Sequence, residues 1–329
     1  MKIVVDAMGG DHAPGSIIEG AVMAVKESDV EIALTGLSGL IEAELSKYEG
    51  WMDLPIEVVH ADDVVEMHEA PSKVLRRKKK SSIKIGLDLV KDGHASAFVS
   101  AGNTGAVLAF ATFTLRLLKG VDRPAIAIQL PTLKGFSILL DAGANVDCKS
   151  SQLFQFGIMG HSFAKYIHGK STPDVGLLSI GEEDSKGNEV TREAFRLLKN
   201  SHVKFIGNLE GKEVYQGNAD VIVCDGFTGN VALKISESLA EMIGENLKLI
   251  FPKIKLTFSF LKFELIINKN NAKLPIKTIN NALKTSLKLK LNSAIYVDKL
   301  SSKKKVPNPQ FSLKIILSLP HIKLICSSV

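Results

Sequence analysis

Residues 96–118 read SAFVSAGNTGAVLAFATFTLRLL, and this stretch decides the fold class. A short apolar run predicts a strand at 96–99, the glycine-bearing turn at 100–105 ends it, and an apolar run predicts a helix at 104–118. Nearly every position of that helix is apolar, so we expect it to be buried on most sides. A strand, a tight turn and a helix in succession are typical of a βα unit.

The same succession recurs along the chain to about residue 248. Short apolar runs predict strands at 2–6, 31–35, 56–60, 96–99, 125–130, 136–140, 175–179, 203–206 and 220–224. Ser16 and Glu19 have the spacing of a capping box at the start of the first helix. The apolar face of that helix comprises Ile17, Ile18, Ala21, Val22 and Val25. Half-buried helices are expected at 151–168 and 228–247. The predicted fold class is α/β, with a three-layer, doubly wound and mostly parallel sheet.

Five of the predicted strands end in a polar, glycine-bearing turn. The turns are DAMGGDH at 6–12, SAGNTG at 100–105, DAGANVD at 141–147, IGEEDSKGN at 180–188 and DGFTGN at 225–230. The carboxyl ends of parallel strands lie at one edge of a sheet, so we expect the five turns to form one cleft. Glycine lets backbone N–H groups approach a ligand, and the helix start that follows adds a partial positive charge. An anion is the ligand that such a cleft favours.

The strongest anion-binding candidates are 102–105 and 228–230. Each supplies a hydroxyl and an amide beside a helix N-terminus, although Asn103 and Thr228 are also consistent with plain helix caps. The carboxylates at the strand ends either gather Mg²⁺ or pin their loops by accepting N–H bonds, and we favour pinning. The predicted loop-organising residues are Asp6, Asp11, Asp141, Asn145, Asp147 and Asp225.

The sequence lacks the motifs that are typical of several functional classes. No GxGxxG follows a strand, and neither GxxxxGK[ST] nor GxSxG is present, which argues against nicotinamide, P-loop and serine-hydrolase sites. The eight His and three Cys lack zinc-site spacing, and Cys224 fits a buried core thiol. We expect no cofactor and no metal. The first residues lack the apolar stretch of a signal peptide, and no window is long enough for a membrane span, so we expect a cytoplasmic protein.

The net charge of +6 conceals two unlike segments. Residues 249–329 contain fifteen Lys, no Arg and two acidic residues, a net charge of +13 that leaves −7 for residues 1–248. All 26 glycines lie at or before Gly244. We divide the chain into an α/β domain at 1–248 and an atypical tail at 249–329. The tail is the product of a shifted reading frame, a basic disordered extension, or a Lys-rich strand segment at 287–291. The acidic domain argues against a nucleic-acid partner.

Six motifs, in order, resemble the bacterial phosphate acyltransferase family of phospholipid synthesis. They are DAMGGDHAP at 6–14, VSAGNTGA at 99–106, DRPA at 122–125, DAGANVDC at 141–148, GEEDSKGNE at 181–189 and CDGFTGNV at 224–231. The resemblance covers about residues 1–248. The tail departs from it, because members of the family continue with a long helical segment and a YGGAP segment, and this chain has no glycine after Gly244.

The resemblance implies transfer of a fatty acyl group from acyl-acyl-carrier-protein to inorganic phosphate. The product, acyl phosphate, would serve a membrane glycerol-3-phosphate acyltransferase in phosphatidic acid synthesis. The resemblance also implies a homodimer, a fold similar to isocitrate dehydrogenase and phosphotransacetylase, and peripheral contact with the inner face of the membrane. Two alternatives stay open: a phosphotransacetylase-like enzyme that uses acyl-CoA, and an inactive partner-binding protein damaged at its C-terminus.

Direct attack by phosphate on a thioester needs a bound phosphate and a stabilised oxyanion, and no covalent enzyme intermediate. The predicted phosphate-binding residues are Gly102, Asn103, Thr104, Gly105, Thr228, Gly229 and Arg123. Asn230 joins Thr228 as a second clamp or oxyanion donor. His12 or Lys186 would place a positive charge near the phosphate or protonate the leaving thiolate. His12 is equally consistent with a turn residue, and Arg123 with a partner of Asp147.

A basic run, RRKKK, lies at residues 76–80. Arg76, Arg77, Lys78, Lys79 and Lys80 are the predicted docking site for the acidic acyl carrier protein. A solvated helix face is the alternative.

Overall fold

The computed structural model describes residues 1–250, 254–259, 262–267, 313–318 and 323–328. The chain forms two compact units. The first comprises 1–128, 148–159 and 306–329, and the second comprises 129–147 and 160–305. The single α/β domain predicted at 1–248 is therefore distributed over both units. Most of the predicted tail, including the strand segment proposed at 287–291, lies outside the described residues.

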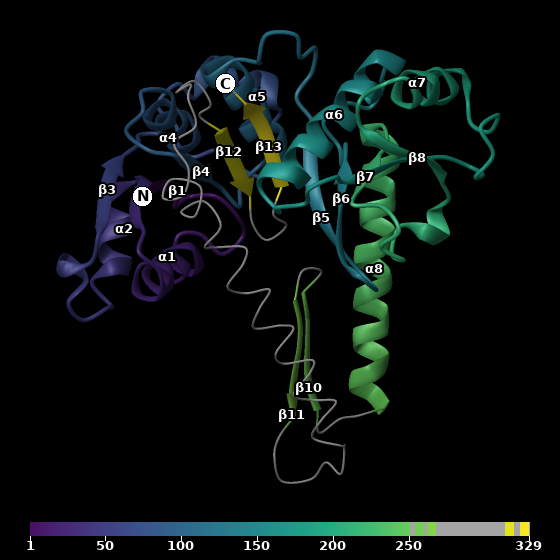
Figure 1. The fold of residues 1–329 in the computed structure, drawn as a ribbon. Coiled ribbons are helices and arrows are strands. Elements are labelled where there is room, and N and C mark those ends of the chain that lie inside the picture. The colour runs from purple at the N-terminus through teal and green to yellow at the C-terminus, as the bar shows by residue number, and fades with distance from the viewer. Residues whose placement is uncertain (251–253, 260–261, 268–312, 319–322, 329) are drawn as a thin grey trace. The chain divides into compact units, whose positions relative to one another are not determined.

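The first unit contains a mostly parallel sheet, whose first four strands are coloured purple to blue in Figure 1. Its first strands are β1 (Lys2–Asp6), β2 (Glu31–Gly36), β3 (Ile56–His60) and β4 (Ala97–Val99). β1 lies between β2 and β4, and β3 pairs with β2, all in parallel. Two strands of the tail, β12 (Leu313–Ser318) and β13 (Lys323–Ser328), continue the sheet from β4. β13 then pairs antiparallel with residues 126–128 of β5 (Ile126–Thr132).

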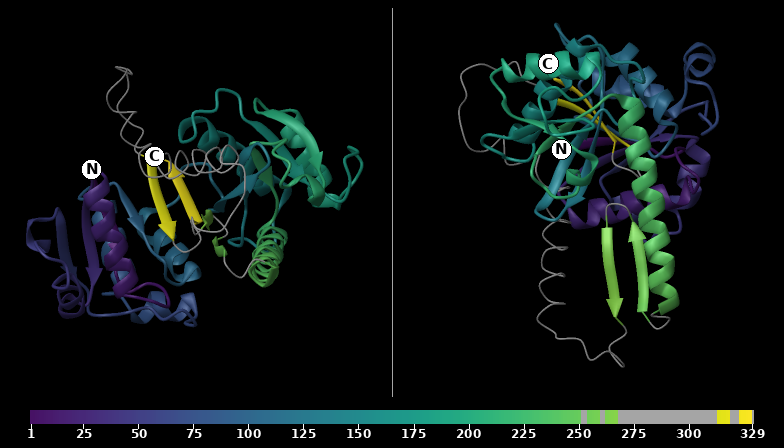
Figure 2. Two further views of the ribbon diagram at one scale, coloured as in Figure 1. Left: turned by 90° about the horizontal axis from the view of Figure 1, so that it is seen from below. Right: turned by 90° about the vertical axis from the view of Figure 1, so that its right-hand side faces the viewer.

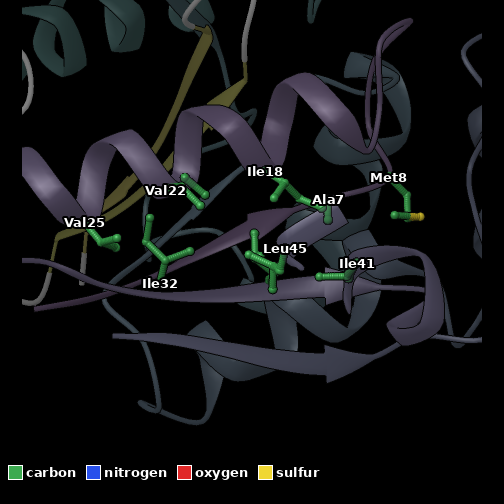
Figure 3. Close-up of a cluster of buried hydrophobic side chains, with 10 residues drawn as sticks. Ala7, Met8, Ile18, Val22, Val25, Ile32, Ile41 and Leu45 are labelled. Carbon is green, nitrogen blue, oxygen red and sulfur yellow. The ribbon is translucent and has the colours of Figure 1, made fainter. Parts of the chain in front are cut away.

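The first unit contains the first part of α6 (Ser150–Tyr166) and, among the described residues, five whole helices. They are α1 (Gly15–Glu27), α2 (Ser38–Leu45), α3 (Pro71–Arg77), α4 (Ser82–Lys91) and α5 (Thr104–Leu115), with a 3-10 turn at η1 (Trp51–Asp53). Residues from α1, α2, β2 and the turn after β1 form a hydrophobic core cluster, in which Ile18, Ile41 and Leu45 are fully buried (Figure 3).

Two local predictions about these helices are wrong. The capping box of Ser16 and Glu19 does not form, because α1 begins at Gly15, two residues earlier than a cap at Ser16 requires, and Pro14 occupies the cap position without a side-chain bond. The helix at 104–118 is not buried on most sides. α5 ends at Leu115 and buries one face, from Ala106 to Thr114, while Phe113 is 64% exposed. Apolar residues on all sides of a helix therefore do not establish burial on all sides.

In the described part of the second unit, four strands pair in parallel, beside residues 129–132 of β5. They are β6 (Gly135–Leu140), β7 (Asp174–Leu178), β8 (Lys204–Leu209) and β9 (Val221–Val223), arranged in the order β6, β9, β7, β8. The helices are the second part of α6 (Ser150–Tyr166), α7 (Glu189–Lys199) and α8 (Gly226–Ile250), with a 3-10 turn at η2 (Gly211–Glu213). β10 (Ile254–Ser259) and β11 (Lys262–Ile267) form an antiparallel hairpin beside α8 (Figure 2).

All nine strands predicted from the sequence are present, each within two or three residues of its predicted ends. The predicted half-buried helices correspond to α6 and α8. The five glycine-bearing turns follow β1 and β4 in the first unit and β6, β7 and β9 in the second. A single cleft formed by all five stays a prediction, and the turns are described below unit by unit.

Candidate functional site

In the first unit, the turns after β1 and β4 are joined through a buried carboxylate. Asp6 accepts hydrogen bonds from Ser100 Oγ at 2.7 Å and from the Met8 N–H at 3.1 Å. The Gly102 N–H donates to the same Ser100 hydroxyl at 3.0 Å. The contact is possible because β1 and β4 are neighbouring parallel strands, so their carboxyl ends lie side by side. Asp6 thus organises both turns, as predicted for a loop-pinning carboxylate.

Burial raises the pKa of Asp6, and hydrogen bonds from Ser82, Ser100 and Met8 oppose that rise. Ser82 is the first residue of α4, a helix that the turn predictions did not include. Burial is the largest of these effects, so the folded protein favours the protonated carboxyl more than the unfolded chain does. The sequence offered no signal that Ser82 would reach Asp6, since the two residues are far apart along the chain.

Asn103 caps α5 and also anchors a distant segment. Its Oδ1 accepts the Ala106 N–H at 3.0 Å, and its Nδ2 lies within hydrogen-bond distance of three carbonyl oxygens, those of Glu66, Met67 and Glu69. The helix-cap alternative for Asn103 is therefore correct as geometry. Its side-chain donors are directed at backbone carbonyls, so any anion held at this turn would meet main-chain N–H groups instead.

Close packing against α3 explains why residue 105 is a glycine. A Cβ added to Gly105 would lie 2.8 Å from Pro71 Cγ, at the start of α3. Thr104, the first residue of α5, is half-buried beside it. The first N–H groups of a helix have no acceptor within the helix, so the start of α5 retains the character of an anion site.

The remaining candidates of the first unit are exposed. The side chains of Asp11, His12 and Arg123 lie at the surface and make no hydrogen bond or ion pair to other described residues. The loop-organising role predicted for Asp11 has no supporting bond there, in contrast to Asp6. Asp147, the alternative partner of Arg123, is also exposed and belongs to the second unit.

In the second unit, Asp141 organises the turn after β6. Its buried carboxylate accepts the backbone N–H groups of Gly143 at 3.1 Å, Ala144 at 2.9 Å and Asn145 at 2.7 Å. Asn145 Nδ2 adds a fourth bond at 2.8 Å. The carboxylate thus acts as a loop pin with four donors, the arrangement that was predicted for Asp141 and Asn145.

Asp225 caps α8. It accepts the Thr228 N–H at 2.8 Å and the Thr228 hydroxyl at 2.7 Å. The cap alternative for Thr228 is therefore wrong, because α8 begins at Gly226, the capping residue is Asp225 and Thr228 is its donor. The Thr228 hydroxyl proton is thus directed at a carboxylate within the turn.

The start of α8 lies directly on the Asp141 turn. A Cβ on Gly229 would lie 1.9 Å from the Asp141 carbonyl oxygen, and a Cβ on Gly226 would lie 2.7 Å from that of Asn145. Asn230 is exposed, and its side chain lies 3.5 Å from the Cβ position of Gly143. The turns after β6 and β9 are therefore one packed assembly, which contains Asn230 at its surface. The neighbouring Cys224 is buried, as predicted.

Lys186 lies in the exposed turn after β7. Its Nζ is 3.9 Å from Glu183 Oε1, and Asn188 at the end of the turn caps α7 through the Thr191 N–H at 2.9 Å. The turn is also fixed by Asn208, which donates to the Glu183 carbonyl at 2.8 Å. Lys186 is thus a surface cation on an ordered turn, and its predicted catalytic role stays a prediction.

The predicted docking residues end α3 and continue past it. Lys78 and Lys80 form ion pairs with Glu69 and Asp62, whereas Arg76, Arg77 and Lys79 are exposed. Within the part of the chain that is described, no group of three or more His, Cys, Asp or Glu is arranged to hold a metal ion. Among the same residues, no helix is both long and apolar enough to cross a membrane.

Comparison with protein families gives one match over most of the chain. The model of the family described as "Fatty acid synthesis protein" matches residues 1–291. A phosphate acyltransferase of Geobacter sulfurreducens is 52% identical over 248 residues, which are 75% of this chain and 71% of the relative. The phosphate acyltransferase of Pelotomaculum thermopropionicum is 53% identical over 241 residues, 73% of this chain and 70% of the relative.

Two solved structures with a similar fold are phosphotransacetylases. That of Streptococcus pyogenes superposes with a TM-score of 0.56 at 18% identity and covers 73% of this chain and 82% of its own. One from Staphylococcus aureus gives a TM-score of 0.51 at 20% identity, with the same coverage of both chains. At this identity the likeness concerns the fold alone. The predicted α/β class with a mostly parallel, phosphotransacetylase-like sheet is confirmed.

Proposed function

This chain belongs to the fatty acid synthesis protein family, in which its relatives are phosphate acyltransferases, and we propose that it transfers a fatty acyl group from acyl carrier protein to inorganic phosphate. The resemblance found in the sequence motifs is thereby confirmed at the level of the family. The phosphate acyltransferase activity in fatty acid and phospholipid synthesis follows from this membership. The identity of the acyl donor and of the residues that act on it belongs to the proposal.

The observation that carries the proposal is the match of the family over residues 1–291, because that range contains all five glycine-bearing turns. Two features of the structure support a phosphate substrate. The start of α5 presents N–H groups beside the Gly102 turn, and the Asp6 carboxyl holds that turn through Ser100. A rigid turn at a helix N-terminus binds a phosphate without a metal or a lysine.

The reaction needs no covalent enzyme intermediate. An oxygen of the phosphate dianion attacks the thioester carbonyl carbon, a C–O bond forms, and the C–S bond then breaks. The products are acyl phosphate and the carrier thiolate, which takes a proton. The enzyme has to hold the phosphate about 3 to 3.5 Å from the carbonyl carbon and to stabilise the oxyanion, and each effect contributes several kcal/mol.

The site residues are proposed as follows. Main-chain N–H groups from Gly102 to Gly105 bind phosphate, and Asn230, with the N–H groups at the start of α8, supplies the second clamp or the oxyanion donors. Arg123 adds a charged contact to phosphate. His12 or Lys186 supplies positive charge or the proton for the thiolate, since both are exposed on turns that follow strands.

Acyl phosphate formation tests the proposal directly. The purified protein would be given phosphate with acyl-acyl-carrier-protein or with acyl-CoA, and hydroxylamine would trap acyl phosphate as the hydroxamate. Product from the carrier-bound donor alone supports the proposal, and preference for acyl-CoA would favour the phosphotransacetylase-like alternative. Folded protein that forms no product from either donor would favour the inactive binding protein.

The homodimer, the contact with a membrane glycerol-3-phosphate acyltransferase and the peripheral membrane contact remain proposals that rest on the resemblance. Acyl phosphate is a reactive anhydride, so transfer to a second enzyme close to the site of release would limit its hydrolysis. The release of acyl phosphate into buffer, with and without that membrane enzyme present, is the corresponding measurement.

A further inference from the structure

The basic run at 76–80 contains two kinds of cation. Lys78 is half-buried and donates to the Val64 carbonyl and to Glu69, so its charge is neutralised inside the fold. Arg76, Arg77 and Lys79 are exposed and form no hydrogen bond or ion pair through their side chains with other described residues. Three cations therefore face solvent without a partner of opposite charge among the residues that the structure describes.

The charge of Lys80, like that of Lys78, is neutralised by an acidic side chain. Its Nζ lies 2.9 Å from Asp62 Oδ2, Asp62 Oδ1 lies 3.0 Å from His60 Nε2, and His60 Nδ1 lies 3.0 Å from Ser38 Oγ. The bond to Lys80, followed by that to His60, lowers the pKa of Asp62. Asp62 is therefore ionised at neutral pH and offsets the charge of Lys80.

The segment that carries the exposed cations is attached to the predicted phosphate-binding turn. Asn103 donates to carbonyls of residues 66–69, which lead into α3, and Pro71 of α3 lies against Gly105. Arg76 and Arg77 follow Pro71 by five and six residues, less than about 10 Å along a helix axis. A partner bound to these arginines would therefore stand close to the turn at 100–105.

We propose that Arg76, Arg77 and Lys79 form the docking surface for an acidic carrier protein, which there presents its acyl thioester to the turn at 100–105. The inference deepens the proposed function and rests on it. Residues 1–248 carry a net charge of −7, so an acidic partner is repelled by most of their surface and attracted at this cluster. A membrane would meet a larger part of the acidic surface than a small protein does, so the cluster favours a protein.

The test is charge reversal with a matched control. Arg76→Glu/Arg77→Glu removes two of the exposed cations, and Lys91→Glu reverses an exposed lysine at the end of α4 in the same unit. Binding of acylated carrier protein would be measured by calorimetry, together with KM and kcat for the carrier-bound and CoA-bound donors. We expect the double variant to raise both the carrier Kd and its KM at least tenfold, with kcat and the CoA donor changed less than twofold.

Lys91→Glu is expected to change the carrier Kd less than twofold. An unchanged Kd in the double variant would overturn the docking surface, as would loss of binding to anionic vesicles with the carrier Kd unchanged. Calorimetry measures carrier binding in the absence of turnover. If the acyl transfer itself fails, the protein will still bind the carrier with a normal Kd but will form no hydroxamate. Should the double reversal fail to fold, Arg76→Ala/Arg77→Ala gives the same comparison with a smaller expected change.

Discussion

Glycines in the turns at the ends of the strands have a packing role as well as any role in ligand binding. A Cβ on Gly229 would collide with the Asp141 carbonyl oxygen, and a Cβ on Gly105 would press on Pro71. Glycine permits close approach of any atom, and in these turns the approaching atom belongs to the protein itself. A glycine-rich turn is therefore weaker evidence for a ligand than its sequence alone indicates.

Gly229→Ala should destabilise the protein by more than about 3 kcal/mol, because the obstructing atom at 1.9 Å is a backbone oxygen that cannot rotate away. Gly20→Ala is the control. Gly20 lies within α1 with no atom within 4 Å of its Cβ position, so the change should stabilise by about 0.5 to 1 kcal/mol. Urea unfolding measures both, and equal effects of the two substitutions would contradict the packing argument.

Asp6→Asn should alter how stability depends on pH. Burial raises the pKa of Asp6, so its contribution to stability is fully present below the unfolded pKa of 3.8 and is lost as pH rises through the folded pKa. Asparagine does not ionise, and the stability of the variant relative to the native protein should therefore be higher at a pH well above 3.8 than at a pH near 3.8. Urea unfolding at both pH values gives this difference.

Asp11→Asn is the control for Asp6→Asn, because Asp11 is exposed and its carboxylate has no partner among the described residues. Its stability relative to the native protein should be flat over the same range. A flat difference for Asp6→Asn as well would show that burial does not perturb that carboxyl.

At the scale of elements, the residue that caps each helix determines how the preceding turn is hydrogen-bonded. Asn103, Asn188 and Asp225 each accept an N–H from the first turn of the following helix. The first helix lacks such a cap, since Pro14 precedes it. A cap motif in the sequence forms only when the helix begins at the required residue, and a shift of two residues, from Ser16 to Pro14, was enough to exclude Ser16.

His168 links the end of α6 to β6 and should make the protein less stable in acid. Its ring lies 4.5 Å from that of Phe136 and 5.2 Å from that of Phe163, and burial lowers its pKa to about 4. Unfolded chains protonate this histidine near its ordinary pKa of 6.5, so the unfolded state gains protons first as pH falls. The free energy of unfolding should fall between pH 6.5 and 4, by at most about 3 kcal/mol from this residue.

His168→Phe keeps a ring in the same place without a titrating group, so part of this pH dependence should disappear. His168 Nε2 is buried without a partner among the described residues, and the substitution therefore costs no hydrogen bond at that atom. His94→Gln, at an exposed position, should leave the pH dependence unchanged. Identical slopes in the native protein and in His168→Phe would contradict the assigned pKa.

At the scale of the whole molecule, α8 presents an apolar stripe. Phe227, Val231, Ile235, Leu239, Met242 and Ile243 are each at least 40% exposed. Their spacing of mostly four residues places them along one side of the helix. Exposed apolar stripes of this kind mark interaction surfaces, and the resemblance to the phosphate acyltransferase family implies a homodimer.

Ile235→Lys/Leu239→Lys should therefore weaken self-association, if α8 contributes to the homodimer. Sedimentation velocity over a range of protein concentrations would detect a shift toward monomer of at least tenfold in the dissociation constant. Lys234→Ala, on an exposed neighbour of the stripe that pairs with Glu237, serves as the control and should have little effect. An unchanged association in the double variant would exclude this face of α8 as the dimer contact.

The sequence by itself determined the nine strands, the α/β class, the cap position of Asn103 and the loop pin at Asp141. Each depends on residues close together in the chain. There the spacing of apolar residues, the turn residues and short-range hydrogen bonds determine the structure. Only the tertiary structure decided that Ser100 and Ser82 hold Asp6, that Pro71 lies on Gly105, and that two of the five cations at 76–80 form ion pairs while the other three have none within the described part of the chain. Those contacts join segments far apart in sequence, and the order of strands in the sheets and the packing of helices on them determine which side chains meet.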